Sequence, residues 1–150
     1  MDGIRVIANN KKVRHEYFIE DTFECGIVLT GTEIKSIRQG KVSLKESYCG
    51  ITAGEIFVHQ MNISSYEQGN IYNVDPVRTR KLLMHKRQIS KLAGQVQKQG
   101  YSIIPLRIYL KAGKAKIEIC IAKGKKLHDK RHTIAARDAD RRMKRAMRDH

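Results

Sequence analysis

The stretch that decides the fold is "YSIIPLRIYLKAGKAKIEICIA", residues 101–122. Two β-type runs rich in Ile, Leu and Tyr flank the short segment "KAG", which predicts an antiparallel hairpin. Pro105 has no N–H group to donate to a neighbouring strand, so we expect it at an edge or a bulge of its strand. This part of the chain therefore belongs to an antiparallel sheet.

Runs of the same type precede this hairpin. The segments "IRVIA" (4–8), "EYFIE" (16–20) and "ECGIVLTG" (24–31) are rich in Ile, Val, Tyr and Phe, and "SYCGI" and "EIFVHQMNI" flank the turn signal "TAGE". About seven short strands with two or three helices indicate an α+β domain that is mainly β, built on a small antiparallel barrel. For so basic a chain, we expect the oligonucleotide-binding fold.

Two segments have helical rather than strand periodicity. The segment "GTEIKSIRQG" (31–40) sets two isoleucines three apart between glycines, and we expect a short helix that closes one end of the barrel. In "DPVRTRKLLMHKRQISKLAGQVQKQG" (75–100), Asp75 and Pro76 suit the start of a helix that ends at Gly100. Its expected apolar face comprises Leu82, Ile89, Leu92, Ala93 and Val96. The pattern fits one kinked helix or two.

The charge of the chain indicates a polyanionic partner. Its 150 residues include 30 Lys and Arg against 15 Asp and Glu, a net charge of +15, which suits nucleic acid or an anionic membrane surface. Binding to a membrane surface needs bulky apolar residues along a basic helix, and the end of the chain offers Ile134, Met143 and Met147 among alanines. No apolar run approaches the ~20 residues that span a bilayer, and the N-terminus does not resemble a signal peptide. We expect a cytoplasmic nucleic-acid-binding protein with no membrane partner.

The three cysteines indicate buried thiols. Cys25, Cys49 and Cys120 lie far apart, within or beside apolar stretches, and none belongs to a CxxC pair. An odd number at such spacings argues against a disulfide framework. We expect all three to pack as small hydrophobic side chains.

The positive charge is concentrated near the C-terminus. Residues 1–122 carry a net charge of +8, and the remaining 28 residues carry +7. We therefore expect a barrel domain over 1–122 and a basic tail over 123–150, with Gly124 as a hinge. A lone helix over 132–150 would be marginal in water and would suffer like-charge repulsion, so we expect the tail to be disordered until phosphates neutralise it.

Motifs of enzymes are missing from the sequence. "HEYFI" has Ile19 where the second histidine of a zinc-binding helix is required, and no Cys/His cluster has metal-ligand spacing. We expect no enzyme, no bound metal and no cofactor. The enzymatic alternative is a metal-dependent nuclease that uses Glu24 and Glu33.

Several polar residues suit contact with RNA. The segment "NNKKVRHEY" (9–17) sets cations beside amides and a histidine, as contact with phosphates and base edges requires, although a charged connecting loop would look the same. Glu24 and Glu33 repel phosphate, and a glutamate at an RNA surface either orients neighbouring cations or accepts from a base amino group. "RTRK" heads the second predicted helix, where its cations bind phosphate or stay solvated. These cations are Arg78, Arg80 and Lys81.

Taken together, these segments resemble a known family. "HEYFIEDTFECGIVLTGTEIKSIRQGKVSLKESY", "DPVRTRKLL" and "IAKGKKLHDKR" closely resemble the SsrA-binding protein family, also called small protein B, in order and spacing over about residues 4–134. The resemblance implies an oligonucleotide-binding-type barrel that binds the tRNA-like domain of transfer-messenger RNA and delivers this RNA to stalled ribosomes. The body would replace the missing anticodon arm. The tail would enter the decoding centre and the empty message channel as a helix, in contact with small-subunit RNA.

The resemblance also implies the RNA-contacting residues. In the barrel they are Asn10, Lys11, Arg14, His15 and Glu24, with Glu33, Lys35 and Arg38 as further candidates. In the tail they are Gly124, Lys125, Lys126, His128, Asp129, Lys130 and Arg131, followed by the cations Arg137, Arg141, Arg142, Lys144 and Arg145. Ala135 and Ala136 stand at positions that are often charged in the family, which bears on individual contacts and not on the role of the tail.

The remaining alternative to this adaptor is a protein that coats RNA through charge alone and binds unrelated RNAs equally well. Nothing in the sequence indicates an obligate interface between copies, so we expect a monomer. His128 is expected to stack on an exposed base while the neighbouring cations hold phosphates.

Overall fold

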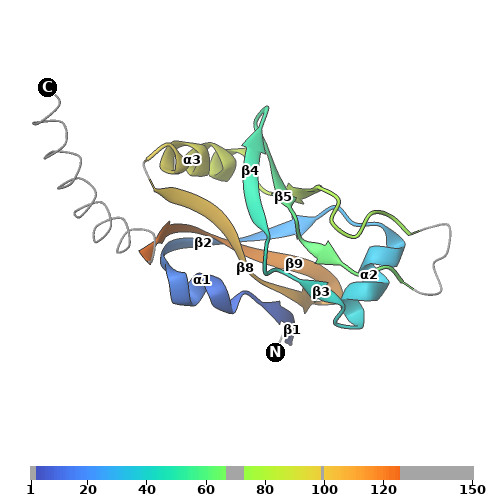
Figure 1. Ribbon diagram of the computed structural model, residues 1–150. Coiled ribbons are helices and arrows are strands. Elements are labelled where there is room, and N and C mark those ends of the chain that lie inside the picture. Colours follow the sequence, from blue (N-terminus) through green and yellow to red (C-terminus); the bar gives the residue numbers. More distant parts are fainter. Residues whose placement is uncertain (1–2, 67–72, 99, 126–150) are drawn as a thin grey trace, which may run out of the picture.

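The structure, a computed structural model, describes residues 3–66, 73–98 and 100–125. Its main sheet has seven antiparallel strands in the order β1-β8-β4-β5-β7-β2-β9, and a further pairing of β8 with β9 closes the ring (Figure 1). The strand β1 continues the sheet beyond this ring through its pairing with β8. The mainly β antiparallel barrel expected from the sequence is confirmed.

The strands and helices have the following bounds. The ring consists of β2 (Tyr17–Ile27), β4 (Tyr48–Thr52), β5 (Glu55–His59), β7 (Arg80–Leu83), β8 (Tyr101–Lys111) and β9 (Lys114–Gly124), and β1 spans Ile4–Asn9. The short strands β3 (Val42–Ser43) and β6 (Asn62–Ile63) form a separate two-stranded sheet. The helices are α1 (Lys11–Glu16), α2 (Gly31–Arg38) and α3 (Lys86–Val96).

Both predicted hairpins are present, and each turns through two residues with positive φ. Ala112 and Gly113 connect β8 to β9 with φ of 51° and 77°, and Ala53 and Gly54 connect β4 to β5 with φ of 53° and 76°. Two successive left-handed residues match the twist of antiparallel strands, which is why such turns are favoured. Pro105 lies at a bulge, because the register of β8 against β9 shifts between Pro105 and Arg107.

The strand β8 separates two hydrophobic clusters. Side chains on its inner face, such as Ile103, pack in the barrel, whereas Ile104 on the opposite face packs under α1 against Val13. The barrel core includes Ile37, Ile56, Val58, Leu82, Leu92, Ile108, Ile117 and Ile119. Because both faces of β8 are covered, four of its residues in a row, 103–106, are buried.

All three cysteines are free and buried, as expected. Burial raises the pKa of the Cys25 thiol to about 12 and that of the Cys120 thiol to about 12 as well. Burial also raises the pKa of Cys49 well above its ordinary value. These thiols therefore stay protonated and pack as small hydrophobic groups.

The prediction of a helix over 75–100 is wrong in its first half. Residues 80–83 form the strand β7, which pairs with β5 and β2, and Asp75 closes a turn by accepting from the N–H of Val77 at 2.9 Å. Burial alternates along "RKLL", which is the period of a strand. Leu82 accordingly packs in the barrel and not on a helix. A single helix, α3, follows, and its Ile89 and Leu92 are buried as predicted.

The segment between the first two strands is a helix and not the connecting loop that was considered. The six residues of α1 follow Asn10, and the buried Val13 anchors them on the barrel. The other short helix, α2, matches its prediction. It begins with a capping box in which the Thr30 hydroxyl accepts from the Glu33 N–H and the Glu33 carboxylate accepts from the Thr30 N–H.

The last strand runs past the predicted end of the barrel domain. Gly124 pairs with Tyr17, and Lys123 pairs with Phe18. Lys123 and Gly124, assigned above to the tail, are therefore strand residues, and Gly124 is not a free hinge. The tail candidates from Lys126 onward lie outside the described residues, so their predicted disorder stays a prediction. No helix within the described ranges is long and apolar enough to cross a membrane.

Candidate RNA interface

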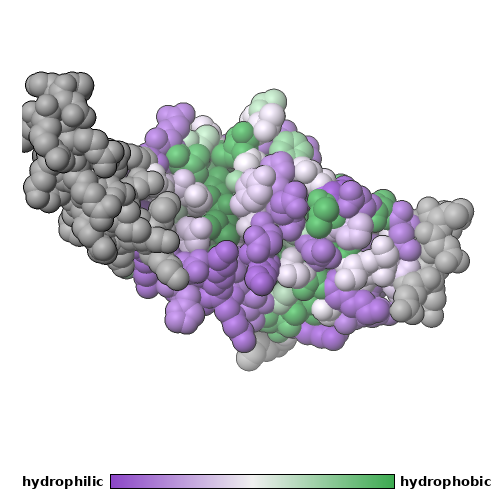
Figure 2. Space-filling view, viewed as in Figure 1, coloured by the Kyte–Doolittle hydropathy of each residue, from purple (hydrophilic) through white to green (hydrophobic). Residues whose placement is uncertain are grey.

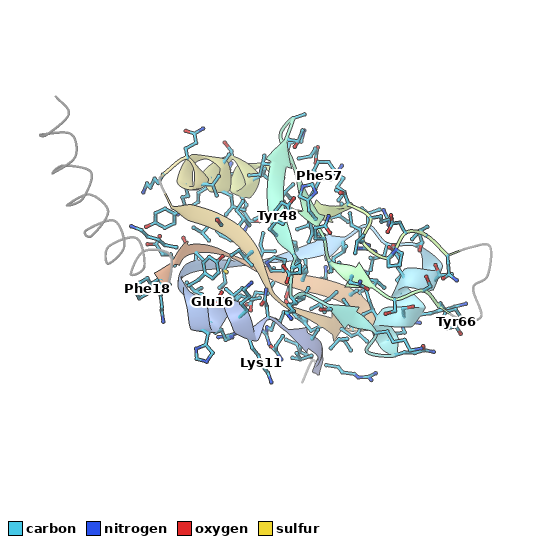
Figure 3. All side chains as sticks on the ribbon, viewed as in Figure 1. Lys11, Glu16, Phe18, Tyr48, Phe57 and Tyr66 are labelled. Carbon is cyan, nitrogen blue, oxygen red and sulfur yellow. The ribbon has the colours of Figure 1, made fainter. Side chains whose placement is uncertain are left out.

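The exposed face of α1 carries three of the predicted RNA contacts. Lys11, Arg14 and His15 are exposed, while Val13 points inward to the cluster beneath the helix. Lys11 extends away from the sheet in Figure 3, and hydrophilic residues gather over this helix in Figure 2. We call Lys11, Arg14 and His15 the α1 cation face. Its side chains can reach phosphates without any change in the fold.

Asn10, predicted to contact RNA, is instead buried and holds α1 in place. Its Nδ2 group donates to the carbonyl oxygens of Leu44 at 3.3 Å and Pro105 at 3.0 Å, and its own backbone N–H donates to Leu106 O at 2.7 Å. Both amide hydrogens that RNA could accept are used inside the protein. We therefore assign Asn10 to positioning the helix and not to contacting RNA.

Glu33 lies at the centre of a buried ion-pair cluster. Its Oε1 accepts from Arg78 Nη2 at 2.6 Å and from the Thr30 N–H at 2.9 Å, and its Oε2 accepts from Arg80 Nε at 2.6 Å. Burial raises the pKa of the Glu33 carboxyl, but the hydrogen bonds from Arg78, Thr30 and Arg80 outweigh it, so the pKa lies below its ordinary value. Glu33 therefore orients two neighbouring cations, Arg78 and Arg80, which is one of the two roles expected for it.

The Glu33 cluster changes the assignment of the arginines. Arg80 is 0% exposed, and its two terminal nitrogens donate to the carbonyl oxygens of Met61 at 2.6 Å and Pro76 at 3.0 Å. This leaves no surface of Arg80 for RNA, so we omit it from the proposed contacts. Arg78 is 29% exposed and can still meet a phosphate. The nuclease alternative loses support, because both oxygens of Glu33 are bound to arginines.

Glu24 faces a groove between β2, β7, β9 and the start of α3. The groove has a volume of about 440 Å³, and Lys81, Leu83, His85 and Lys116 also line it. The Tyr109 hydroxyl donates to Glu24 Oε2, and Lys111 Nζ lies 3.5 Å from the same oxygen. The Tyr109 bond is the main reason that the pKa of the Glu24 carboxyl lies below its ordinary value, with Lys111 acting in the same sense. We call Glu24, Lys81, Leu83, His85 and Lys116 the β2–β7 groove.

The sequence reasoning missed the apolar side of this groove. Leu83 is 53% exposed, whereas the preceding Leu82 is buried. Leu83 pairs with Gly26 across the sheet, and a Cβ at Gly26 would come within 3.3 Å of Leu83 Cβ. Gly26 therefore lets Leu83 lie close to β2. A strand assignment for "RKLL" would have found Leu83, because adjacent leucines in a strand point to opposite faces.

The structure does not gather all the predicted contacts in one place. Lys35 and Arg38 are exposed on α2, which lies at the far end of the barrel from α1 (Figure 1). The ammonium of Lys35 lies 5.4 Å from the centroid of the Tyr66 ring. At the other end, Lys125 Nζ lies 5.0 Å from the centroid of the Phe18 ring, where the described chain stops.

The barrel topology, the α1 cation face and the β2–β7 groove define a small basic β-barrel protein of the oligonucleotide-binding class. The family model described as "SmpB protein" matches residues 7–149, which is nearly the whole chain. The chain belongs to this SmpB protein family.

Individual relatives agree with this assignment. The chain is 57% identical over 148 residues to an "SsrA-binding protein" of Ruminiclostridium cellulolyticum, which covers 99% of this chain and 96% of that relative. It is 60% identical over 144 residues to the "SsrA-binding protein" of Acetivibrio thermocellus, with 93% and 94% covered. A solved structure described as "tmRNA-SmpB: a journey to the center of the bacterial ribosome" matches with a TM-score of 0.68 and 43% identity, over 79% of this chain and 83% of that one.

Proposed function

We propose that this protein is an RNA-binding adaptor and not an enzyme, that it binds the tRNA-like domain of transfer-messenger RNA, and that it delivers this RNA to stalled ribosomes. Support comes from membership of the SmpB protein family and from relatives called SsrA-binding proteins at 57% and 60% identity. The description of the similar solved structure names tmRNA–SmpB and the bacterial ribosome.

The observation that carries the proposal is the chemistry of the β2–β7 groove. Lys116 and Lys81, whose Nζ lies 3.3 Å from Glu55 Oε2 in the same groove, supply positive charge for phosphates. Leu83 supplies an exposed apolar surface for a base or ribose. Glu24 would repel phosphate, but its carboxylate is held ionised by Tyr109 and Lys111, so it can accept a hydrogen bond from a base amino group. A groove that offers all three contacts suits a structured RNA better than a charged surface alone does.

The α1 cation face is a second RNA surface in this proposal. Lys11, Arg14 and His15 project from a helix that Asn10 and Val13 hold rigidly on the barrel. Cations held on a rigid helix contribute phosphate contacts at a lower loss of side-chain and backbone freedom than cations on a loop. Together with the β2–β7 groove, this face would contact the tRNA-like domain, while the tail beyond Lys125 would contact ribosomal RNA.

The two adjacent leucines of β7 provide a matched test. Leu83→Ala should lower the affinity for a tRNA-like RNA about fivefold, because RNA would cover only the exposed half of the leucine side chain, which contributes ~1 kcal/mol. It should leave the melting temperature unchanged. Leu82→Ala should instead destabilise the fold by ~2–5 kcal/mol. Fluorescence anisotropy with labelled RNA and thermal unfolding measure the two effects. Unchanged RNA affinity of Leu83→Ala would exclude the groove as the binding site.

Salt dependence and competition separate the adaptor from a protein that coats RNA through charge alone. If barrel and tail together neutralise about six phosphates, the logarithm of the affinity should fall against the logarithm of salt concentration with a slope of roughly −4 to −5. Between 50 and 200 mM salt, the expected loss of affinity is on the order of 10³-fold.

At 150 mM salt, an unlabelled random hairpin should compete poorly with the tRNA-like RNA. Equal competition by both RNAs would favour non-specific coating.

A further inference from the structure

A second, separate cleft opens where β4 meets β8. One residue pair, Cys49 with Ile103, links β4 to β8 in the part of the chain that the structure describes. A cavity of about 220 Å³ lies on one side of this join, and a cavity of about 320 Å³ lies on the other, next to α3. Tyr48 and Ser102 line both cavities. Hydrophobic residues come to the surface between α3 and β4 in Figure 2.

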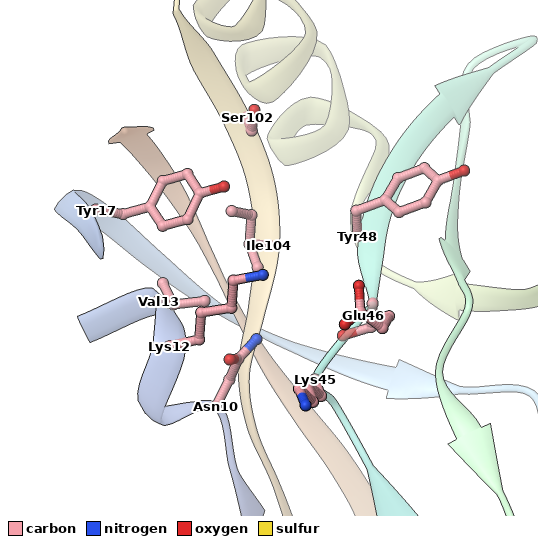
Figure 4. Close-up of a pocket in the computed structure, with 10 residues that line it drawn as sticks. Asn10, Lys12, Val13, Tyr17, Lys45, Glu46, Tyr48, Ser102 and Ile104 are labelled. Carbon is pink, nitrogen blue, oxygen red and sulfur yellow. The ribbon is translucent and has the colours of Figure 1, made fainter. Parts of the chain in front are cut away.

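Two tyrosines line the first cavity from opposite sides. Tyr17, at the start of β2, points toward β4 across it, whereas Tyr48, at the start of β4, lies on the opposite side with its ring directed away from Tyr17 (Figure 4). Ile104 of β8 lies between them. Ile104 is buried, so the floor is a packed apolar surface. The Tyr17 ring, this apolar floor and the exposed Tyr48 ring beside it suit a flat aromatic ligand such as a nucleobase.

Tyr48 is held as a stacking platform. Its ring stacks on the His59 ring with 5.0 Å between centroids and 28° between planes, and Tyr48 is nevertheless 50% exposed. His59 is held in turn, since its Nδ1 lies 3.1 Å from Thr79 Oγ1. Opposite His59, a Cβ at Gly50 would come within 3.2 Å of His59 Nε2, so glycine allows the histidine ring to lie across β4. One face of the Tyr48 ring is therefore supported and half of the side chain is open to a ligand.

The charged groups at this cleft also suit a nucleotide. Lys12 and Lys45 are exposed and line the first cavity from opposite sides, α1 and the segment before β4. Glu46 lines it as well and offers an acceptor for a base amino group. Successive aromatic rings flanked by cations are the usual design of single-strand nucleic-acid sites.

We propose that the cleft between Tyr17 and Tyr48 binds one unpaired nucleotide of an RNA strand. Its base stacks on Tyr48, and Lys12 and Lys45 contact the phosphates on either side of it. This inference rests on the proposed RNA-binding function, but it concerns a different surface, because neither tyrosine belongs to the β2–β7 groove. It predicts that the protein holds a single-stranded segment in addition to a structured RNA domain.

The absence of tryptophan from the chain allows a direct test. In Tyr48→Trp, the only indole lies in the cleft, and a single-stranded RNA hexanucleotide should quench its fluorescence by more than half. A blunt duplex of the same sequence should not. Adding Tyr17→Ala should lower the affinity for the hexanucleotide about tenfold. Adding Tyr17→Phe, which keeps the ring, should leave this affinity unchanged. Phe57→Trp, on the neighbouring β5 and outside both cavities, is the matched control.

The outcomes separate this inference from the proposed function. Quenching in Tyr48→Trp that depends on the ring at Tyr17, with binding of the tRNA-like RNA unchanged, would support the cleft. If the tRNA-like RNA binds but the hexanucleotide does not quench the indole fluorescence, the proposed nucleotide site in the cleft is wrong and the proposed function stands. Equal quenching in Phe57→Trp, or quenching by an acidic peptide instead of RNA, would also overturn the proposed nucleotide site.

Failure of both RNAs to bind would overturn both proposals. Thermal unfolding of each variant confirms that it is folded.

Discussion

At the scale of single residues, Glu33 shows how one carboxylate links three parts of the chain. It caps α2 through the Thr30 N–H, binds Arg78 in the segment before β7, and neutralises the buried Arg80 of β7 itself. A guanidinium that is fully buried is tolerated because it is paired and because Met61 and Pro76 accept its remaining donors. Removing the Glu33 carboxylate leaves the buried Arg80 without a counter-ion, whereas removing Arg80 leaves Glu33 paired with Arg78.

Glu33→Gln should therefore lower the free energy of unfolding by about 3 kcal/mol at pH 7, because Arg80 loses its counter-ion. The pKa of Glu33 lies below 4.5 in the folded protein, so its contribution is complete above the unfolded pKa and is lost as the pH falls through the folded pKa. Urea denaturation at pH 7 and at successively lower pH should show the wild type approaching the variant in acid.

Glu46→Gln is the control for this experiment, since Glu46 is exposed. It should leave the free energy of unfolding at pH 7 unchanged. A Glu33→Gln protein as stable as the wild type at pH 7 would show that Arg80 does not depend on this carboxylate.

At the scale of elements, α1 is too short to be stable alone and exists because the barrel holds it. A six-residue helix is far below the length at which an isolated helix forms in water. Its start is fixed by the Asn10 bonds to Leu44 and Pro105, and its buried face is Val13. The bulge at Pro105 thus helps to hold α1 in place, since Asn10 donates a hydrogen bond to the Pro105 carbonyl oxygen.

Asn10→Ala should loosen α1 without unfolding the barrel. The loss of two hydrogen bonds to buried carbonyls should cost ~1–3 kcal/mol, and hydrogen exchange of the α1 amides should become about tenfold faster. The exposed Lys11→Ala variant should leave exchange unchanged. If α1 keeps its protection in Asn10→Ala, the packing of Val13 alone holds the helix.

At the scale of the whole molecule, the proposed RNA surfaces are distributed around the barrel and not concentrated at one point. The β2–β7 groove, the α1 cation face and the cleft beside Tyr48 lie at different places on the barrel and on the helix α1 that packs against it (Figure 1). A net charge of +15 gives every one of these surfaces a positive background. Such an arrangement suits an adaptor that contacts two RNAs at once.

Truncation should separate the barrel from the tail. A chain that ends at Lys125 should keep its melting temperature and its affinity for the tRNA-like RNA within about threefold, but it should fail to support tagging on stalled ribosomes in a reconstituted assay. A chain that ends at Ala122 also loses Lys123 and Gly124 from β9. It should be less stable by ~1 kcal/mol, or a few degrees of melting temperature. Normal tagging by the shorter chains would contradict the proposed division of work.

The sequence by itself determined the barrel and the kind of partner. The β-type runs that flank "KAG" and "TAGE" predicted both hairpins, the spacing in 31–40 predicted α2, and the excess of Lys and Arg indicated nucleic acid. These features can be read without a structure, because strand and helix periods are local and net charge is a simple sum over residues.

Only the tertiary structure decided which polar residues are available to RNA. Asn10 and Arg80 look like surface contacts in the sequence, yet the structure buries both, because their partners Pro105 and Glu33 lie 95 and 47 residues away along the chain. The same holds for the groove beside Leu83 and the cleft beside Tyr48. Each is formed by strands that meet only when the sheet closes, and no local pattern records that meeting.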